Sequence, residues 1–306
     1  MKRHFEGVLN GLPVVLMMGG PGKEREVSLR SGAAVAGALR QCGALVTETD
    51  VIGPGFTLPD GTALVFNLIH GTFGEDGELQ ALLDAMGIPY TGEGAEGSRF
   101  AFDKIETKSR FDRAGVPTCP WKTLRQGEPP DCWFPCVVKA PRQGSSVGVH
   151  LVGSPADLPA ALEDCFQYGD QVLIEELFKG RELTVGILGE AALPIVEIVP
   201  HEGFYDYEHK YTKGASEYHV PAALPPEETD RIQNAALAAC RALDLQVYSR
   251  VDVLLAPDGR INVLEINTIP GMTETSLLPK AAAAAGLGFP ALCEEIAGLS
   301  LSKRLP

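Results

Sequence analysis

Two units of apolar strand followed by helix occupy the first hundred residues. An apolar run at residues 13–18 leads through a glycine turn into a helical pattern from about Ser28 to Cys42. A buried strand at residues 63–69 then precedes helical spacing from Gly77 to Met86. Repeated units of strand, turn and helix build parallel sheets with helices on their faces. We therefore expect an N-terminal α/β domain over residues 1–98.

The pattern changes after a charged amphipathic helix at Asp103 to Ala114, which a glycine and a proline terminate. Between Cys136 and Gly189 the apolar runs are short and separated by glycines, which is typical of an antiparallel sheet with helices. We expect a central domain at residues 99–188. The last third alternates strands, a polar loop, a helix and a hairpin, which predicts a C-terminal α+β domain over residues 189–306.

Composition narrows the possible functions. The chain carries 40 acidic and 26 basic residues, a net charge of −14, so we expect no nucleic acid or membrane partner, since both need a basic surface. The basic N-terminal residues precede no apolar run, and we expect neither a signal peptide nor a transmembrane helix. The seven cysteines form no Cys-x-x-Cys pair, which indicates reduced thiols in a cytoplasmic protein.

The last hairpin brings polar residues together. Asp258-Gly259 between alternating apolar residues predicts a two-residue type I′ turn. That turn would place Asp252 opposite Glu265 and Arg250 opposite Asn267, with all four side chains on one face.

Facing carboxylates at Asp252 and Glu265 would repel each other unless a cation lies between them. Aspartate, glutamate and asparagine offer hard oxygen ligands, which suit Mg²⁺ or Mn²⁺ that also holds substrate phosphates. The alternative is a solvated hairpin face in which Arg250 pairs with an acid. Both interpretations remain open from the hairpin alone.

A second polar cluster lies at residues 135–149. A strand ends in Lys139, and a loop of small residues follows from Gly144 to Gly148. Backbone amides of such a loop can cover a triphosphate while the lysine supplies a point charge. The loop is not a Walker A motif, because no Gly-Lys-Ser/Thr sequence ends it and no helix follows.

The same loop also spells G-x-S-x-G, the nucleophile elbow of serine hydrolases, with Ser146 as the nucleophile. That motif requires a helix after the turn, whereas β-branched residues follow here. His219, the last histidine, also precedes Asp252, so the best-placed acid lies after every candidate base. Both features argue against a hydrolase.

Residues 92–97 fit the dinucleotide pattern G-x-G-x-x-G. Glu93 and Glu96 would put negative charge beside a pyrophosphate, and no ribose-binding acid follows on a second strand. We therefore interpret this segment as a linker between domains.

His70 lies in a loop at the end of a predicted strand, with Glu75 close enough in sequence to orient it. Such loops are where α/β domains bind ligands. A capping histidine in a turn is the competing interpretation.

These pieces occur together in one family. The segments GGPGKEREVSL, HGTFGEDG, VVKAPRQGSSVG, FYDYEHKYT, SRVDVLL and LEINTIPGMTETSLL resemble the D-alanine-D-alanine ligases of the ATP-grasp superfamily. The resemblance runs from about residue 13 to residue 296. It implies that the N-terminal domain binds D-alanine, and that the central and C-terminal domains form the ATP-grasp fold around the nucleotide.

The resemblance implies a ligation in two steps that supplies peptidoglycan precursors. ATP phosphorylates the carboxylate of a first D-alanine, and the amine of a second D-alanine attacks the acyl phosphate. Lysine and Mg²⁺ clamps suit phosphoryl transfer, because positioning and charge neutralisation supply most of its catalysis.

On the nucleotide side, the resemblance implies that Lys104 and Lys139 hold the α and β phosphates and that Lys210 reaches the γ-phosphate. Residues 175–178 would form the adenine hinge and Glu182 would bind the ribose. The residues implied in ATP binding are Lys104, Lys139, Gly144, Ser145, Ser146, Val147, Glu175, Glu176, Leu177, Phe178, Glu182 and Lys210. The residues implied in holding two Mg²⁺ or Mn²⁺ ions are Asp252, Glu265 and Asn267.

On the amino acid side, the family pattern implies that Glu24 anchors the ammonium of the first D-alanine. Ser145 and Tyr211 would join Glu24 in one hydrogen-bonded set. Arg250 and the backbone amide of Gly271 would stabilise the tetrahedral intermediate, as an oxyanion hole does.

Four residues are expected to bind substrate. The resemblance implies that Ser276 and Leu277 hold the carboxylate of the second D-alanine, while His70 and Glu75 belong to the same binding region. Ser276 has an alternative role as the cap of the following helix. For Tyr211 the alternative is a place on a surface loop.

The polar, aromatic-rich loop from His201 to His219 is expected to be a mobile lid that excludes water from the acyl phosphate. Its Lys210-Tyr211 pair resembles dipeptide-forming ligases, so we do not expect a depsipeptide product. The sequence departs from the family pattern at Thr72-Phe73, where Arg-Gly is frequent, at Gln143, where an acid is frequent, and at Arg99, where a small residue is frequent.

Two further expectations follow from the resemblance. The family is usually dimeric, so we expect a homodimer. A non-catalytic ATP-grasp binding module is the competing class of function, and the retained Arg250 argues against it, because nucleotide binding alone needs no group that stabilises the intermediate.

Overall fold

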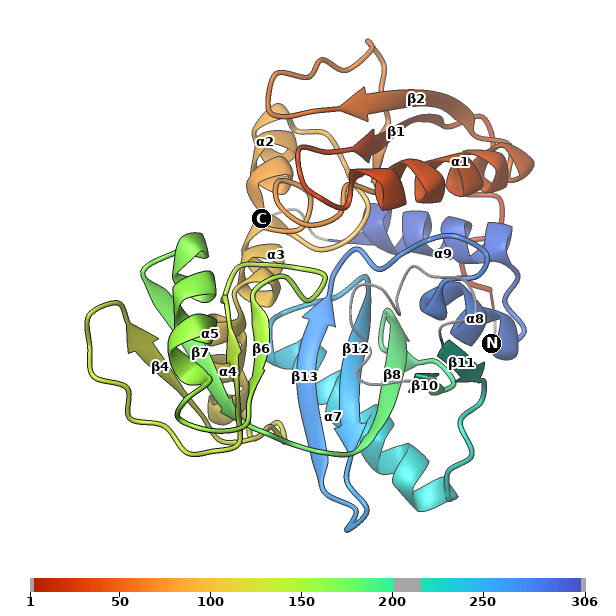
Figure 1. Cartoon of the computed structure of the whole chain (residues 1–306). Coiled ribbons are helices and arrows are strands. Elements are labelled where there is room, and N and C mark those ends of the chain that lie inside the picture. Colours follow the sequence, from red (N-terminus) through yellow and green to blue (C-terminus); the bar gives the residue numbers. More distant parts are fainter. Residues whose placement is uncertain (1–2, 201–215, 304–306) are drawn as a thin grey trace.

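The computed structural model describes residues 3–200 and 216–303. Three parallel strands in the order β2-β1-β3 form the first sheet along the chain (Figure 1). The elements of this layer are β1 (Pro13–Gly19), α1 (Arg25–Gln41), β2 (Leu45–Val51), β3 (Leu64–Asn67) and α2 (Glu78–Met86). The helix expected from Ser28 begins one turn earlier, with Glu24 at its N-cap position. The parallel α/β layer is therefore as predicted.

A four-stranded antiparallel sheet, in the order β4-β7-β5-β6, follows in the chain. Its elements are β4 (Trp121–Arg125), β5 (Cys136–Lys139), β6 (Val149–Val152), α5 (Leu158–Cys165), the 3₁₀ turn η1 (Phe166–Tyr168) and β7 (Gln171–Glu176). Val138, Val172 and Ile174 face α5 and form a small core with it. The opposite face of this sheet is left for a ligand.

Two helices, α3 (Ala95–Phe102) and α4 (Lys104–Ala114), connect the first two sheets. Asp103 caps α4, because its carboxylate accepts hydrogen bonds from the amides of Ile105 and Glu106. Gly115 ends the helix in the left-handed conformation that glycine adopts without strain. The predicted end of this helix is therefore confirmed, and it begins one residue after the predicted start, because Asp103 is its cap.

The third sheet is antiparallel, in the order β11-β10-β8-β12-β13, with β9 paired to β8. Its strands are β8 (Arg181–Leu188), β9 (Ala191–Ala192), β10 (Val196–Pro200), β11 (Ser216–His219), β12 (Tyr248–Leu255) and β13 (Ile261–Asn267). The helices of this part are α7 (Pro226–Ala242), α8 (Leu277–Ala284) and α9 (Phe289–Ser302). Helix α7 covers the face of the sheet opposite the candidate site.

The C-terminal helices pack against the N-terminal layer. Figure 1 shows α9 running alongside α1, and the two helices are in contact. One core cluster contains Leu16 and Leu39 from the first layer together with Leu278 and Ile296 from the last two helices. The start and the end of the chain thus share a core, which fixes the first sheet relative to the third.

Residues 92–97, the segment predicted to be a linker, are packed against the start of β12. Helix α3 begins within this segment, at Ala95. Glu93 is buried, and its carboxylate accepts hydrogen bonds from the amides of Gln246, Val247 and Tyr248 where β12 begins. The segment therefore leads from the first layer into α3, as a linker does, and Glu93 packs it against the start of β12.

The turn of the β12/β13 hairpin also differs from the prediction. Ala256 and Arg260 close a three-residue loop in which Gly259 has a positive φ of 80°, so the two-residue type I′ turn was wrong. A β-bulge next to Asp252 then shifts the register by one residue. Asp252 consequently does lie opposite Glu265, and Arg250 opposite Asn267, as expected.

All seven cysteines are free thiols, as predicted. Within residues 3–200 and 216–303, no single helix is long and apolar enough to cross a membrane. The pair α8 and α9, bent by 102°, passes that test of length and composition together.

Candidate active site

Two neighbouring cavities meet at the face of the β12/β13 hairpin. The larger, of about 1090 Å³, lies between the two antiparallel sheets. The smaller, of about 340 Å³, lies between the hairpin and the loops of the N-terminal layer. Asp252 and Glu265 line the larger cavity, whereas Arg250 and Asn267 line the smaller one. The four residues predicted to share one face are therefore together, at the boundary between two binding spaces.

The carboxylate of Asp252 is held by three side chains. Arg250 binds it in a bidentate manner, with Nε 2.9 Å from Oδ1 and Nη2 2.8 Å from Oδ2. Thr184 donates to Oδ1 over 2.7 Å, and the Asn267 amide donates to Oδ2 over 3.2 Å. Such bidentate, charge-assisted contacts fix the direction of both groups.

The ion pair of Arg250 with Asp252 is the contact that the alternative interpretation of this hairpin expected. The hairpin also carries oxygen ligands of the type that a divalent cation prefers. The Lys104 ammonium lies 3.4 Å from Oε2 of Glu265, so cations already neutralise both facing carboxylates. Among the described residues there is no cluster of three or more His, Cys, Asp or Glu side chains suited to a metal. Two carboxylates and the Asn267 amide oxygen are hard ligands, and substrate phosphates and water would complete an Mg²⁺ shell.

The larger cavity contains a buried lysine and glutamate. Lys139 at the end of β5 forms an ion pair with Glu175 of β7, whose other carboxylate oxygen lies 2.6 Å from the Lys108 ammonium. Burial raises the pKa of Glu175, but the charges and hydrogen bonds of the two lysines lower it to about 2. Lys139 faces the cavity as predicted, and Lys108 is a residue that sequence analysis missed.

Most of the other predicted nucleotide-binding residues line the same cavity, but Gly144 and Ser145 line the smaller one and Val147 lines neither. Glu176, Leu177, Phe178 and Glu182 follow β7 and lie on its wall. Two exposed apolar side chains, Leu151 and Val199, add a surface suited to a planar ring, and sequence analysis missed both.

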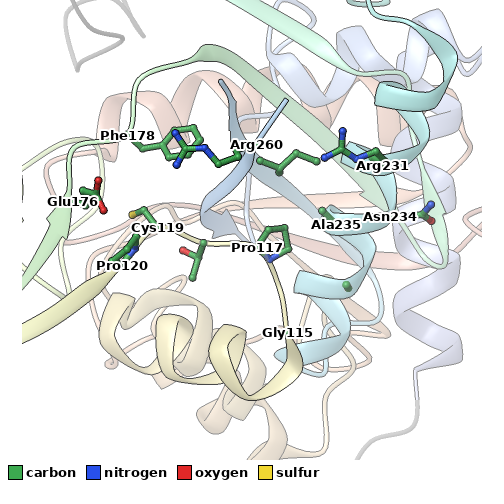
Figure 2. A pocket seen from close by; sticks show the side chains of 13 residues that line it. Gly115, Pro117, Cys119, Pro120, Glu176, Phe178, Arg231, Asn234, Ala235 and Arg260 are labelled. Carbon is green, nitrogen blue, oxygen red and sulfur yellow. The ribbon is translucent and has the colours of Figure 1, made fainter. Parts of the chain in front are cut away.

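A separate hollow of about 650 Å³ lies between the end of α4, helix α7 and the hairpin tip (Figure 2). Glu176 and Phe178 line both this hollow and the larger cavity. The segment after β7 is therefore a thin wall between the two.

The serine loop lies between the two cavities. Ser145 and Ser146 have positive φ angles of 50° and 61°, an uncommon conformation for residues other than glycine. The Ser145 hydroxyl donates to Oε1 of Glu24 and lines the smaller cavity, whereas Ser146 lines the larger. Strand β6 follows the loop directly, so the strand, turn and helix of a nucleophile elbow are not formed, and the argument against a hydrolase is confirmed.

Glu24 lies close to two glycines. A Cβ atom at Gly71 or Gly144 would lie 2.8 or 3.0 Å from Oε2 of Glu24. Larger residues at these positions would displace the carboxylate. The glycines therefore let two loops approach one carboxylate at the edge of the smaller cavity.

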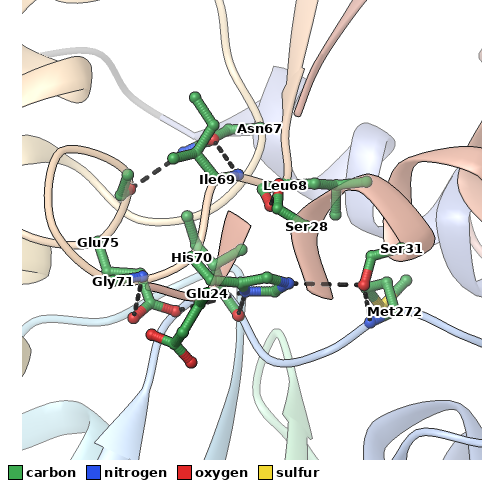
Figure 3. Close-up of polar contacts among 12 residues, drawn as sticks. Glu24, Ser28, Ser31, Asn67, Leu68, Ile69, His70, Gly71, Glu75 and Met272 are labelled. Carbon is green, nitrogen blue, oxygen red and sulfur yellow. Dashed lines mark hydrogen bonds and ion pairs between the residues drawn. The ribbon is translucent and has the colours of Figure 1, made fainter. Parts of the chain in front are cut away.

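His70 connects the loop after β3 to the loop before α8 (Figure 3). Its Nδ1 lies 2.8 Å from the Ile269 carbonyl oxygen and 3.9 Å from Oε1 of Glu75, while Nε2 lies 3.5 Å from the Ser31 hydroxyl. Burial lowers the pKa of His70, but Glu75 outweighs it and the pKa is raised. The contact with Glu75 is as predicted, and the buried ring is not a turn cap. Sequence analysis missed Ser31.

Ser276 and Leu277 line the smaller cavity together with Gly271. The Ser276 hydroxyl accepts a hydrogen bond from the Thr273 amide over 3.1 Å and lies 2.8 Å from the Thr273 hydroxyl. Although Ser276 occupies the N-cap position of α8, its side chain makes no capping bond. The alternative role of this serine as a helix cap is thus not observed.

The departures from the family pattern have different structural consequences. Phe73 has a positive φ of 77° in a position where glycine would be unstrained, and its ring is buried in the first layer. The backbone carbonyl of Gln143 accepts a hydrogen bond of 2.7 Å from Lys104. Arg99 lies on α3 and is largely exposed. Residues 201–215 of the expected lid, which include Lys210 and Tyr211, lie outside the described residues, and the end of the expected loop forms β11 (Ser216–His219).

Two sheets that enclose a lysine-lined cavity, with an acidic hairpin at its end, define the ATP-grasp class of fold. A family model described as the D-ala D-ala ligase C-terminus matches residues 111–297, and one described as the D-ala D-ala ligase N-terminus matches residues 47–93. The chain belongs to the D-alanine-D-alanine ligase family.

Individual proteins are similar over almost the whole chain. A D-alanine-D-alanine ligase of Methylacidiphilum infernorum is 48% identical over 94% of this chain and 95% of its own. One of Syntrophotalea carbinolica is 44% identical over 95% and 97%. The crystal structure of a Bacillus anthracis D-alanine-D-alanine ligase superposes with a TM-score of 0.86 at 34% identity, covering 95% of this chain and 98% of that one. The ATP complex of the Bacillus anthracis enzyme gives 0.84 at 33% identity, with 96% and 98% covered.

Proposed function

We propose that the protein joins two D-alanine molecules to D-alanyl-D-alanine and converts ATP to ADP and phosphate. The observation that carries this proposal is the position of the β12/β13 hairpin. Its polar face borders both a cavity large enough for a nucleotide and a smaller cavity suited to amino acids. A group held in each cavity would react at this boundary.

The first step transfers a phosphoryl group. A carboxylate oxygen of the first D-alanine attacks the γ-phosphorus, and the bond to the β-phosphate oxygen breaks, so ADP leaves and an acyl phosphate forms. Lys104 and Lys139 hold the phosphates, and residues 144–148 cover them. Asp252, Glu265 and Asn267 would hold two Mg²⁺ or Mn²⁺ ions, which neutralise charge on the transferring group when bound. Lys210 would reach the γ-phosphate.

The second step forms the peptide bond. The amine of the second D-alanine attacks the acyl carbon, loses a proton and expels phosphate. Arg250 and Gly271 line the smaller cavity, and the arginine and the Gly271 amide would stabilise the oxyanion of the tetrahedral intermediate. Glu24, supported by Ser145 and by Tyr211, would hold the first ammonium group. Ser276, Leu277 and the pair His70 and Glu75 would orient the substrates.

A test is phosphate release from ATP and Mg²⁺ with D-alanine, with L-alanine and D-lactate as controls and the product identified by mass spectrometry. We expect phosphate and D-alanyl-D-alanine with D-alanine alone. ATP binding without turnover would favour a non-catalytic binding module, and turnover with D-lactate would contradict the dipeptide assignment.

The proposal extends to the location and the oligomeric state of the protein. We infer a cytoplasmic homodimer that supplies peptidoglycan precursors. The sequence resemblance supports the assembly, and mass measurement by light scattering tests it.

A further inference from the structure

Lys108 is one of the most completely buried charged residues of the described chain. Its side chain is 1% exposed, although it belongs to the charged helix α4. The ammonium contacts the Glu175 carboxylate at 2.6 Å, the Thr118 hydroxyl and, at 3.9 Å, the sulfur of Cys119. The Thr118 hydroxyl and the Cys119 sulfur accept hydrogen bonds from the ammonium, and the Glu175 carboxylate pairs with it by charge.

Glu175 has a different lysine on each carboxylate oxygen. Oε1 faces Lys108 and Oε2 faces Lys139. Strands β5 and β7 are antiparallel neighbours with Lys139 opposite Leu173, so Lys139 and Glu175 point to the same face of the sheet. The glutamate is 2% exposed, and a buried carboxylate needs such partners, because an unpaired one is strongly destabilising.

The two lysines differ in what else they can reach. Lys139 is 12% exposed and lines the larger cavity. Lys108 lies behind Glu175 and is not among the residues lining that cavity. Lys139 can therefore turn from Glu175 to an anion in the cavity, whereas Lys108 stays with the glutamate.

We propose that Lys108 is a positioning residue that acts as the permanent counter-ion of Glu175, so that Lys139 can exchange from Glu175 to a nucleotide phosphate. The proposal rests on the nucleotide-binding part of the proposed function. The reason is the net charge of the cluster of Lys108, Lys139 and Glu175. The two lysines and one glutamate carry one net positive charge toward the triphosphate. Without Lys108 the remaining pair is neutral, and Lys139 is the sole partner of a buried carboxylate.

A charge-conserving pair of substitutions tests this role. We expect Lys108→Met to weaken the binding of a non-hydrolysable ATP analogue with Mg²⁺ at least tenfold, measured by isothermal titration calorimetry. Adding Glu175→Gln restores the net charge of the cluster, so the double variant should bind the analogue more tightly than Lys108→Met alone. Lys108→Arg, which keeps the charge, should weaken binding less than Lys108→Met.

Lys122→Met is the matched control, because Lys122 pairs with the exposed Asp131 away from the cavity and its loss changes the total charge equally. It should leave nucleotide binding unchanged. Equal effects of Lys108→Met in the wild-type and Glu175→Gln backgrounds would overturn the proposal. A Lys108→Met variant with a lowered melting temperature but unchanged nucleotide affinity would also overturn the proposal.

Two further measurements keep the proposal testable. If Lys108→Met does not fold, the comparison is made between Lys108→Arg and the double variant, and a double variant that folds but loses nucleotide binding contradicts the proposal. The kinetic readout is a raised KM for ATP with an unchanged KM for D-alanine. Failure of the wild-type protein itself to bind the analogue would instead refute the proposed function.

Discussion

Arg250 binds both carboxylate oxygens of Asp252, its neighbour two residues further along β12. The two side chains share one face of the strand, since side chains alternate with a period of two. Asp252 lines the larger cavity and Arg250 the smaller. One ion pair thus joins the proposed metal ligand to the proposed oxyanion-stabilising group.

Arg250→Ala should abolish ligation while nucleotide binding survives. Removing a donor to an oxyanion costs about 10²- to 10³-fold in kcat, whereas the phosphate-binding lysines remain. The measurement pairs ATP-analogue binding by calorimetry with product formation by mass spectrometry. Parallel losses of binding and turnover would show that Arg250 acts on the nucleotide instead.

Asp252→Asn and Glu265→Gln should each raise the Mg²⁺ concentration that gives half-maximal turnover. Replacing a carboxylate by an amide keeps the size and removes the charge that favours a hard divalent cation, and we expect a shift on the order of tenfold. Asp258→Asn at the exposed hairpin tip is the control. An unchanged Mg²⁺ dependence in both variants would rule out the metal assignment.

Ser145→Ala should weaken amino acid use more than nucleotide use. The Ser145 hydroxyl donates to the Glu24 carboxylate, and hydrogen bonds to charged groups are worth about 1.5–3 kcal/mol. We expect the KM for D-alanine to rise about tenfold or more on that basis. Ser146→Ala is the matched control, because Ser146 lines the nucleotide cavity. If both variants change the KM for D-alanine equally, Ser145 and Ser146 do not serve different cavities.

The stability of the protein in acid should depend on Glu175. The pKa of Glu175 is about 2 in the folded protein, whereas its ordinary value without these contacts is 4.5. A lowered carboxyl pKa contributes stability that is present above the unfolded value and is lost as pH falls through the folded value. The loss lies between about pH 4.5 and pH 2 and is on the order of 3 kcal/mol.

Urea unfolding at several pH values tests the role of Glu175. Wild type should lose free energy of unfolding more steeply below pH 4.5 than Glu175→Gln, which lacks the titrating group. Only the slopes are compared, because the substitution also leaves two lysines without their partner. Equal slopes would contradict the lowered pKa.

Several elements could be predicted from the sequence because their signals are local. The Asp103 cap and the Gly115 stop define α4 within one helix. The pairing of Asp252 with Glu265 was also correct, although for a different reason: a three-residue turn and a one-residue bulge offset each other. A bulge has no reliable sequence signal, since it depends on the packing around the strand.

Other parts of the site could not be predicted, because their partners are distant in sequence. In the sequence Glu93 looks like a solvated loop acid. Only the folded chain brings three backbone amides, at and just before the start of β12, to its carboxylate. Ser31 lies in the middle of α1, and its contact with His70 exists only once the loop after β3 lies over that helix.

The sequence alone determined the layers of the fold and the family, because hydrophobic periodicity and motif residues act over short distances. The pairing of Asp252 with Glu265 also depended on a bulge that only the folded sheet contains. The tertiary structure decided which charges are buried. Lys108 occupies a helix whose pattern suggests a solvated charged surface, and packing of α4 against Thr118 and the end of β7 turns it into a buried counter-ion. Burial depends on elements that are far apart in the chain, and the free energy of an ion pair depends on whether its charges are buried.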